Sequence, residues 1–131
     1  MITIGGLAGQ TGVKVPTIRY YEQIGLMPAP PRTKGRQRRY AVQDVSRLNF
    51  IRHARDLGFE IEDIRELLAL TAEPQASCHK ADSIALRHLG AVDRRIAQLT
   101  ALRAELHRMI DECGRGRVCD CLIIDMLSRP V

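Results

Sequence analysis

The chain lacks several features that would assign it to a common class of protein. It contains no run of about 18 apolar residues to cross a membrane, and no charged-then-apolar leader with a small-residue cleavage site. The sequence therefore predicts a cytoplasmic protein with no membrane partner. A glycine-rich phosphate loop, a convincing Ser-His-Asp set, an HExxH pattern and a Cys-x-x-Cys pair are also missing. We therefore expect that the chain is not an enzyme.

Acidic residues are absent from one short stretch that is rich in basic ones. Residues 1–69 carry 11 basic and 7 acidic side chains, whereas residues 70–131 carry 9 and 8, so the net charge of +5 lies mainly at the front. Five of the basic side chains fall within residues 32–39, where no acid is present. Such clusters are typical of phosphate contact and indicate a nucleic-acid partner. A solvated basic loop is the alternative interpretation.

Cysteine is scarce, with four residues in the chain, and its placement is uneven. Cys78 stands alone, whereas Cys113, Cys119 and Cys121 fall within nine positions. In a reducing cytoplasm such thiols are more often metal ligands or reactive groups than structural disulfides, which remain the alternative. The segment between Cys78 and Cys113 reads as continuous helix, so these thiols lie roughly 50 Å apart in one chain. Two helices that pair antiparallel would bring Cys78 of one chain beside Cys113 of the other.

Helical patterns cover most of the chain. Pro16 suits a first helical position, and Gly25 can close the helix that follows. The proline cluster over 28–31 ends any helix, and the basic stretch as far as Tyr40 reads as a short hairpin or wing. The expected helices of this front half cover residues 4–10, 16–23, 42–57 and about 60–70.

A longer helix is expected from Lys80 to Glu112. Its apolar positions step by four and three, with one break at Arg103 where Leu102 can substitute. This spacing indicates a coiled-coil seam. A helix of this length is too long to pack along the small front domain. We therefore expect it to pair with a second copy rather than pack on the chain's own domain. The seam positions are Ala85, Leu89, Val92, Ile96, Leu99, Leu106 and Ile110.

Four segments in fixed order carry a resemblance to a known family. They are Ile18-Arg19-Tyr20-Tyr21-Glu22, Arg39-Tyr40, the run from Phe50 to Phe59, and Ile64-Arg65-Glu66-Leu67-Leu68. Together they resemble the MerR family of metal-responsive transcription regulators, over essentially the whole chain. The resemblance implies a mainly α fold with a winged helix-turn-helix domain at 1–70, a linker at 71–79, an antiparallel coiled-coil dimerisation helix at 80–112, and a metal-binding loop with a short terminal helix at 113–131.

The implied DNA contacts lie on the second helix, the wing and the third helix. A helix starting near Val15 is small enough for the major groove, where Arg19 offers a guanidinium and Thr17 and Tyr20 offer hydroxyls. We expect Tyr21 to pack inward instead. The side chains expected to hold the DNA backbone rather than read its sequence are Arg36, Arg38, Arg39 and Tyr40 on the wing, and Arg52 and Arg55 on the third helix.

The resemblance also implies a metal site that joins two chains. Relatives hold the ion with the cysteines that match Cys113 and Cys121, and Cys119 can serve as a fourth ligand. Cys78 separates the metal classes, because copper-responsive members carry serine there and bind a monovalent ion with two thiolates. A site made of Cys78 from one chain and the loop of the other therefore predicts a divalent soft metal ion, namely cadmium, lead, mercury or zinc.

The cysteine pattern also keeps other interpretations open. The spacing of eight residues between Cys113 and Cys121 resembles that of copper sensors, so copper(I) is the alternative cofactor. The doubled cysteine and loop histidine of zinc sensors are missing. A thiol cluster can also oxidise, which would make the chain a thiol redox-responsive regulator. Cys78 as a bystander thiol, and His79 as an additional ligand, are further alternatives.

The resemblance finally implies a mechanism. A homodimer of the family sits with RNA polymerase on an overlong promoter spacer and represses transcription without metal. Metal binding at the dimer interface shifts the two DNA-binding domains, the DNA is kinked and untwisted, and the dimer becomes an activator. By analogy with the family, we expect the target to be a metal efflux or detoxification gene.

Overall fold

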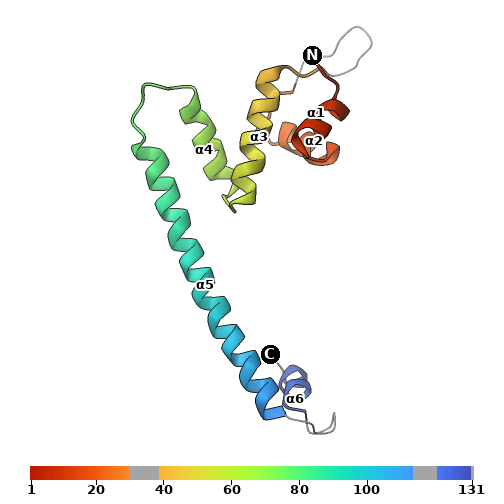
Figure 1. The fold of residues 1–131 in the computed structure, drawn as a ribbon, viewed down its shortest axis with the longest axis vertical. Coiled ribbons are helices and arrows are strands. Elements are labelled where there is room, and N and C mark those ends of the chain that lie inside the picture. The colour runs from red at the N-terminus through yellow and green to blue at the C-terminus, as the bar shows by residue number, and fades with distance from the viewer. Residues whose placement is uncertain (30–38, 114–120, 131) are drawn as a thin grey trace. The chain divides into compact units, whose positions relative to one another are not determined.

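The computed structural model describes residues 1–29, 39–113 and 121–130. Within these ranges the chain forms helices joined by short connections (Figure 1). It divides into two compact units, Met1–Asp82 and Ser83–Val131. The helices are α1 (Ile4–Thr11), α2 (Val15–Gln23), α3 (Val42–Asp56), α4 (Ile61–Thr71), α5 (His79–Cys113) and α6 (Leu122–Ser128).

Local sequence signals start and end the first two helices. The Thr3 hydroxyl accepts a hydrogen bond from the Gly6 N–H at 3.1 Å and so caps the start of α1. Gly12, with φ of 75°, ends that helix in the left-handed conformation. Pro16 lies in the first turn of α2, where its missing N–H costs nothing. Gly25, with φ of 77°, turns the chain after α2.

Helices α3 and α4 are joined by a turn that contains a third glycine in the left-handed conformation. The Asp44 carboxylate accepts the Ala41 N–H at 2.8 Å and caps the start of α3. Gly58, with φ of 84°, separates the two helices. The observed ends of these helices and of α1, α2 and α5 fall within one residue of the expected ends, because the capping and breaking residues are explicit in the sequence.

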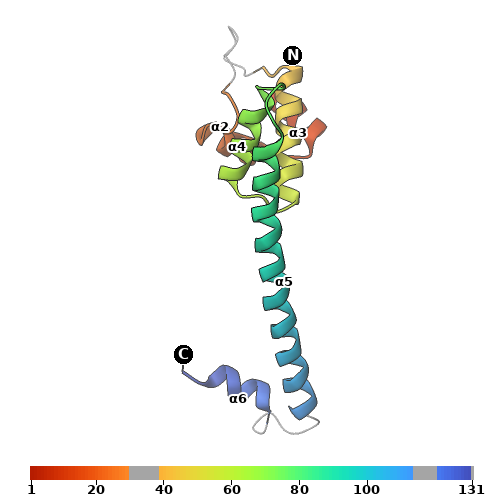
Figure 2. The same ribbon diagram turned by 90° about the vertical axis from the view of Figure 1, so that its left-hand side faces the viewer.

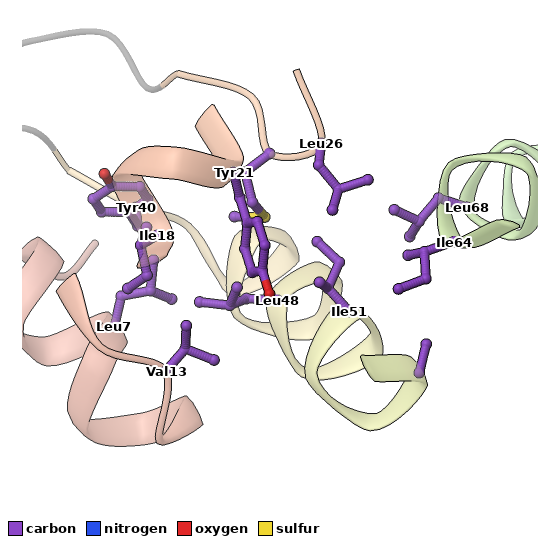
Figure 3. Close-up of a cluster of buried hydrophobic side chains, with 12 residues drawn as sticks. Leu7, Val13, Ile18, Tyr21, Leu26, Tyr40, Leu48, Ile51, Ile64 and Leu68 are labelled. Carbon is purple, nitrogen blue, oxygen red and sulfur yellow. The ribbon is translucent and has the colours of Figure 1, made fainter. Parts of the chain in front are cut away.

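The apolar core of the first unit lies between these four helices. Tyr21 of α2 lies beside Leu48 and Ile51 of α3, Ile18 lies beside Leu7 of α1, and Leu26 faces the side chains of α4 (Figure 3). Burial of each large apolar side chain stabilises the fold by about 1.5–3 kcal/mol before entropy is counted. The core residues are Leu7, Val13, Ile18, Tyr21, Leu26, Met27, Tyr40, Leu48, Ile51, Ala54, Ile64 and Leu68.

A single antiparallel bridge is the strand-like pairing found in the parts of the chain that the structure describes. Ile2 and Tyr40 exchange backbone hydrogen bonds of 2.9 and 2.8 Å. This pairing anchors the chain just after the expected wing. The wing itself falls largely within residues 30–38, outside the described residues.

The second unit contains most of α5, together with α6. Helix α5 is 35 residues long and unbroken in both views (Figures 1 and 2). Many of its large apolar side chains are exposed, which is unusual for a helix that packs within its own chain. These exposed residues are Leu86, Leu89, Val92, Ile96, Leu99, Leu102, Leu106 and Ile110. In the described ranges, no helix is long and apolar enough to cross a bilayer.

Candidate DNA interface and metal-binding residues

Helix α2 has one buried face and one open face. Ile18 is fully buried and Tyr21 nearly so, at 8% exposure, which confirms that Tyr21 packs inward. Arg19 is exposed and Tyr20 is 50% exposed, because these positions point away from the i, i+3 stripe that enters the core. Thr17 is half-buried. The open face therefore presents cationic and hydroxyl groups, as expected for a helix that enters a DNA groove.

A shallow groove of about 400 Å³ runs along the open face of α2. Arg19, Glu22, Gln23 and Ala29 line it. The groove therefore lies between the exposed face of α2 and Ala29, which precedes the expected wing.

The expected contact of Tyr40 with the DNA backbone is not supported by its position. Its side chain is fully buried, and its hydroxyl donates to Glu22 Oε2 at 2.6 Å. Tyr40 is a core residue that joins the end of the wing segment to α2. The sequence could not separate the two roles, because a tyrosine beside a basic stretch suits either of them.

Arg52 and Arg55 already hold hydrogen bonds within the chain. A guanidinium nitrogen of Arg52 donates to the Thr11 carbonyl at the end of α1, and Arg52 lies 3.9 Å from the Asp56 carboxylate. Arg55 Nη1 donates to the Phe59 carbonyl at 2.8 Å. Both side chains keep exposed surface, so contact with DNA phosphates stays a prediction. Arg39 is half-buried, whereas Arg36 and Arg38 lie outside the described residues.

Two arginines that the sequence interpretation did not single out contact the end of α2. Arg47 Nε of α3 donates to the Leu26 carbonyl at 2.8 Å. Arg65 Nη2 of α4 donates to the Ile24 carbonyl at 3.0 Å. The available signal was Gly25, since a helix that ends there leaves carbonyl groups in need of donors.

Cys78 lies at the start of α5 and is exposed. Its thiol lies 4.0 Å from Asp82 Oδ1, to which it can donate. The Cys78 carbonyl accepts the Asp82 N–H at 3.0 Å, so the residue caps the first turn of the helix. A thiol held at a helix start, open to solvent, is a suitable donor for a soft metal ion.

Cys121 directly precedes α6 and is half-buried. Its carbonyl accepts the Asp125 N–H at 3.0 Å, which fixes its backbone at the first turn. The side chain of Cys113 and the whole of Cys119 lie outside the described residues. Among the residues that are described, no three His, Cys, Asp or Glu side chains gather in one chain. The predicted ligand set therefore stays a prediction.

Comparison with known proteins adds independent information about the whole chain. The family model described as MerR HTH family regulatory protein matches residues 2–71, and the one described as MerR, DNA binding matches residues 45–109. The HTH-type transcriptional regulator HmrR of Sinorhizobium medicae strain WSM419 is 40% identical, covering 98% of this chain and 87% of that protein. The HTH-type transcriptional regulator ZntR of Escherichia coli strain K12 is 43% identical, covering 86% and 81%.

A solved structure resembles the chain along its full length. The crystal structure of the transcription regulator PbrR691 from Ralstonia metallidurans CH34 in complex with lead(II) superposes with a TM-score of 0.83 and is 32% identical. The match covers 98% of this chain and 100% of that one. The helical fold described above is therefore shared with a known regulator.

Proposed function

The chain belongs to the MerR family of helix-turn-helix regulatory proteins, and from that premise we propose that it is a homodimeric transcription regulator that binds promoter DNA and responds to a soft divalent metal ion. It acts in the cytoplasm together with RNA polymerase. It represses without metal and activates metal-resistance or efflux genes with metal. Family membership agrees with the expectation that the chain is not an enzyme.

The open face of α2 supports the DNA-binding part of the proposal. Arg19 and Tyr20 are exposed there, while the rest of the helix is fixed by its buried face. A recognition helix needs this combination, because base contacts require side chains that are free to reach the groove on a backbone that does not move. Arg19 is the side chain that we assign to base or phosphate contact.

The position of Cys78 is the observation that carries the metal part of the proposal. Cys78 immediately precedes α5, and Cys113 is the last residue of that helix. An α-helix of 35 residues is roughly 52 Å long, so one chain does not bring these cysteines to one ion. An antiparallel pair of α5 helices would place Cys78 of one chain beside Cys113 and Cys121 of the other, with Cys119 as a fourth ligand.

The donor set fits a soft divalent ion. Two thiolates neutralise a divalent charge, and a third leaves a net charge near minus one that Arg115 and Arg117 could offset. Cadmium, lead, mercury and zinc all accept such sites. The resemblance to a regulator solved with lead(II) supports this class of ion. A site that joins the two chains could bias the dimer between two arrangements on DNA, and so kink and untwist the promoter.

Transcription in vitro tests the proposal. The reduced wild-type protein and the Cys78→Ser variant are added to RNA polymerase and the chain's own promoter, over buffered free cadmium, lead, mercury, zinc and copper(I). We expect one or more divalent ions to activate the wild type. The variant should keep its DNA affinity but show no activation. A variant that is induced as well as the wild type would refute the cross-subunit site.

Two other outcomes would redirect the assignment. Activation by copper(I) alone, with Cys78 dispensable, would mean that the loop with Cys113 and Cys121 selects the metal. Activation by an oxidant in the absence of metal would identify a thiol redox regulator. Addition of a metal chelator distinguishes the two, because it reverses metal induction and leaves oxidation in place.

A further inference from the structure

The carboxyl end of α2 is held by arginines from two other helices. Arg47 of α3 donates to the Leu26 carbonyl at 2.8 Å, and Arg65 of α4 donates to the Ile24 carbonyl at 3.0 Å. Both acceptors flank Gly25, the left-handed residue that ends the helix. Carbonyls at a helix end carry partial negative charge, so a guanidinium is a favourable partner for them.

The same turn is fixed from its other side by backbone and core contacts. The N–H groups of Leu26 and Met27 both donate to the Tyr21 carbonyl, at 2.8 and 3.0 Å. Leu26 and Met27 are buried, and Leu26 faces Ile64 and Leu68 of α4 (Figure 3). The turn that ends α2 is therefore packed on α4 and also hydrogen-bonded to it through Arg65.

Helix α4 is also the element that leads to Cys78. It ends at Thr71, and the exposed segment that follows contains two turn hydrogen bonds, from Glu73 N–H to the Leu70 carbonyl and from Ala76 N–H to the Glu73 carbonyl. These turns connect α4 to Cys78 over a few residues. Among the helices that precede Cys78, α4 is the one connected to it directly. A displacement of Cys78 is therefore transmitted to α4 first.

We infer that Arg65 is a positioning residue that transmits the state of the metal site to the recognition helix. This inference rests on the proposed function. When the dimer changes arrangement on metal binding, α4 moves, and the Arg65 hydrogen bond carries α2 with it. Without that bond, within the part of the chain that the structure describes, only apolar contacts such as those of Leu26 join the end of α2 to α4, so a shift of α4 turns α2 less.

The Arg65→Gln variant tests this role by two measurements. Amide hydrogen exchange at Leu26 and Met27 should speed up about tenfold in the metal-free protein, because the turn loses a fixed donor. In the transcription assay, activation at saturating metal should fall about tenfold, within the usual range of coupling between sites. Metal affinity and metal-free DNA affinity should stay within about threefold of the wild type, since neither site loses a contact.

The Thr71→Val variant is the matched control. The Thr71 hydroxyl donates to the Leu68 carbonyl at 2.6 Å, so this change removes a side-chain hydrogen bond of α4 that does not reach α2. It should leave both exchange at Leu26 and metal activation as in the wild type. An equal loss of activation in both variants would show a general weakening of α4 and would overturn the inference.

The remaining outcomes are also decisive. Unchanged exchange, or full activation, in Arg65→Gln would overturn the inference. A fall in metal-free DNA affinity as large as the fall in activation would also overturn it, because the role would then be structural only. A wild type that responds to no metal would refute the proposed function instead, and the exchange measurement would still decide whether Arg65 couples the two helices.

Discussion

Gly12 is a residue that no larger side chain replaces without strain. Its φ of 75° is in the left-handed region, and a Cβ there would overlap the Arg52 guanidinium that donates to the Thr11 carbonyl. We expect Gly12→Ala to lower the free energy of unfolding by about 1.5–3 kcal/mol, from backbone strain and the displaced hydrogen bond. Urea denaturation at one fixed protein concentration measures the change, because dimer stability depends on concentration.

The control for that substitution lies three residues away. Gly9 is within α1, is exposed, and has nothing within 4 Å of the position where a Cβ would be. Gly9→Ala should raise the free energy of unfolding by about 0.5–1 kcal/mol, because alanine loses less backbone entropy in a helix. Equal effects of the two substitutions would show that the left-handed turn and the Arg52 contact are unimportant.

Tyr40 and Glu22 form a partly buried link between the end of the wing segment and the recognition helix. Tyr40→Phe removes the 2.6 Å hydrogen bond to the Glu22 carboxylate and keeps the ring. We expect a loss of about 1–2 kcal/mol in the free energy of unfolding, since bonds to charged acceptors are stronger than average. Tyr20→Phe is the control, because that ring is 50% exposed, and its stability should stay within about 0.5 kcal/mol of the wild type. A neutral Tyr40→Phe would contradict the link.

The role of an individual side chain was harder to predict than the local structure around it. The motif around Tyr20 and Tyr21 was enough to predict which ring turns inward, because helix periodicity and the nearby Ile18 determine the buried face. The same reasoning did not determine whether Tyr40 and Arg52 serve the core or the surface. A tyrosine or an arginine can serve the core or the surface equally well, and only the folded position of Glu22 or Thr11 distinguishes the two.

At the scale of the helix, α5 carries a three-residue ion-pair group near its end. Arg108 donates to both Glu105 and Glu112, with an Nη1 to Glu112 Oε2 distance of 2.9 Å. The hydrogen bond from Arg108 lowers the pKa of Glu105, and the same contact raises the pKa of Arg108. Because the pKa of Glu105 is lowered, the ion pair contributes its full stabilisation at pH values above the ordinary glutamate pKa. The gain is lost as pH falls through the lowered value.

Carbon-detected NMR titration of Glu105 checks this electrostatic effect. We expect the Glu105 carboxyl to titrate below the ordinary glutamate pKa of about 4.3, and Arg108→Gln to return it to that value. Arg94→Gln is the control, since its position lies roughly 16 Å along the helix, beyond the Debye length at physiological salt. A Glu105 pKa that does not respond to Arg108→Gln would show that the pair does not form in solution.

Helices were more predictable than the contacts between them. Thr3, Pro16, Gly25 and Gly58 mark helix ends by local chemistry, which a sequence displays directly. The Arg65 contact with Ile24 joins residues 41 positions apart, and although Gly25 marks a helix end, no local feature indicates which side chain donates there. The expected wing and metal loop have little periodic pattern in the sequence, and they fall largely within residues 30–38 and 114–120, outside the described residues.

At the scale of the molecule, the exposed apolar side of α5 is the surface that we propose pairs with a second copy. Leu99 is 50% exposed and occupies a seam position, whereas Ala101 lies on the opposite side of the heptad. We expect Leu99→Glu to weaken dimerisation at least about tenfold, because a charge in the seam loses its water. Ala101→Glu should leave the dimer intact. Sedimentation equilibrium measures both, and a Leu99→Glu protein that stays dimeric at low concentration would exclude this seam.

The proposed metal site makes a prediction that only two chains together can satisfy. A Cys78→Ser homodimer and a Cys113→Ser/Cys121→Ser homodimer each lack a complete three-thiolate site. In their heterodimer, Cys78 of the second chain meets the intact loop of the first, so one wild-type site is restored and the other is lost. After equal mixing and chain exchange, about half of the dimers are mixed, and the tight-site content should reach about a quarter of the wild-type value.

Competition with a thiol-matched metal chelator measures these tight sites in the mixture and in each parent. The tight sites should appear only after chain exchange, and not when the Leu99→Glu change is also present in both chains, because the seam is then broken. If all ligands came from one chain, neither chain of the heterodimer would hold a complete set. Mixing would then restore nothing, whatever the affinity of the wild type. The same result would remove the physical link between Cys78, α4 and the partner's loop on which the proposed regulation by metal rests.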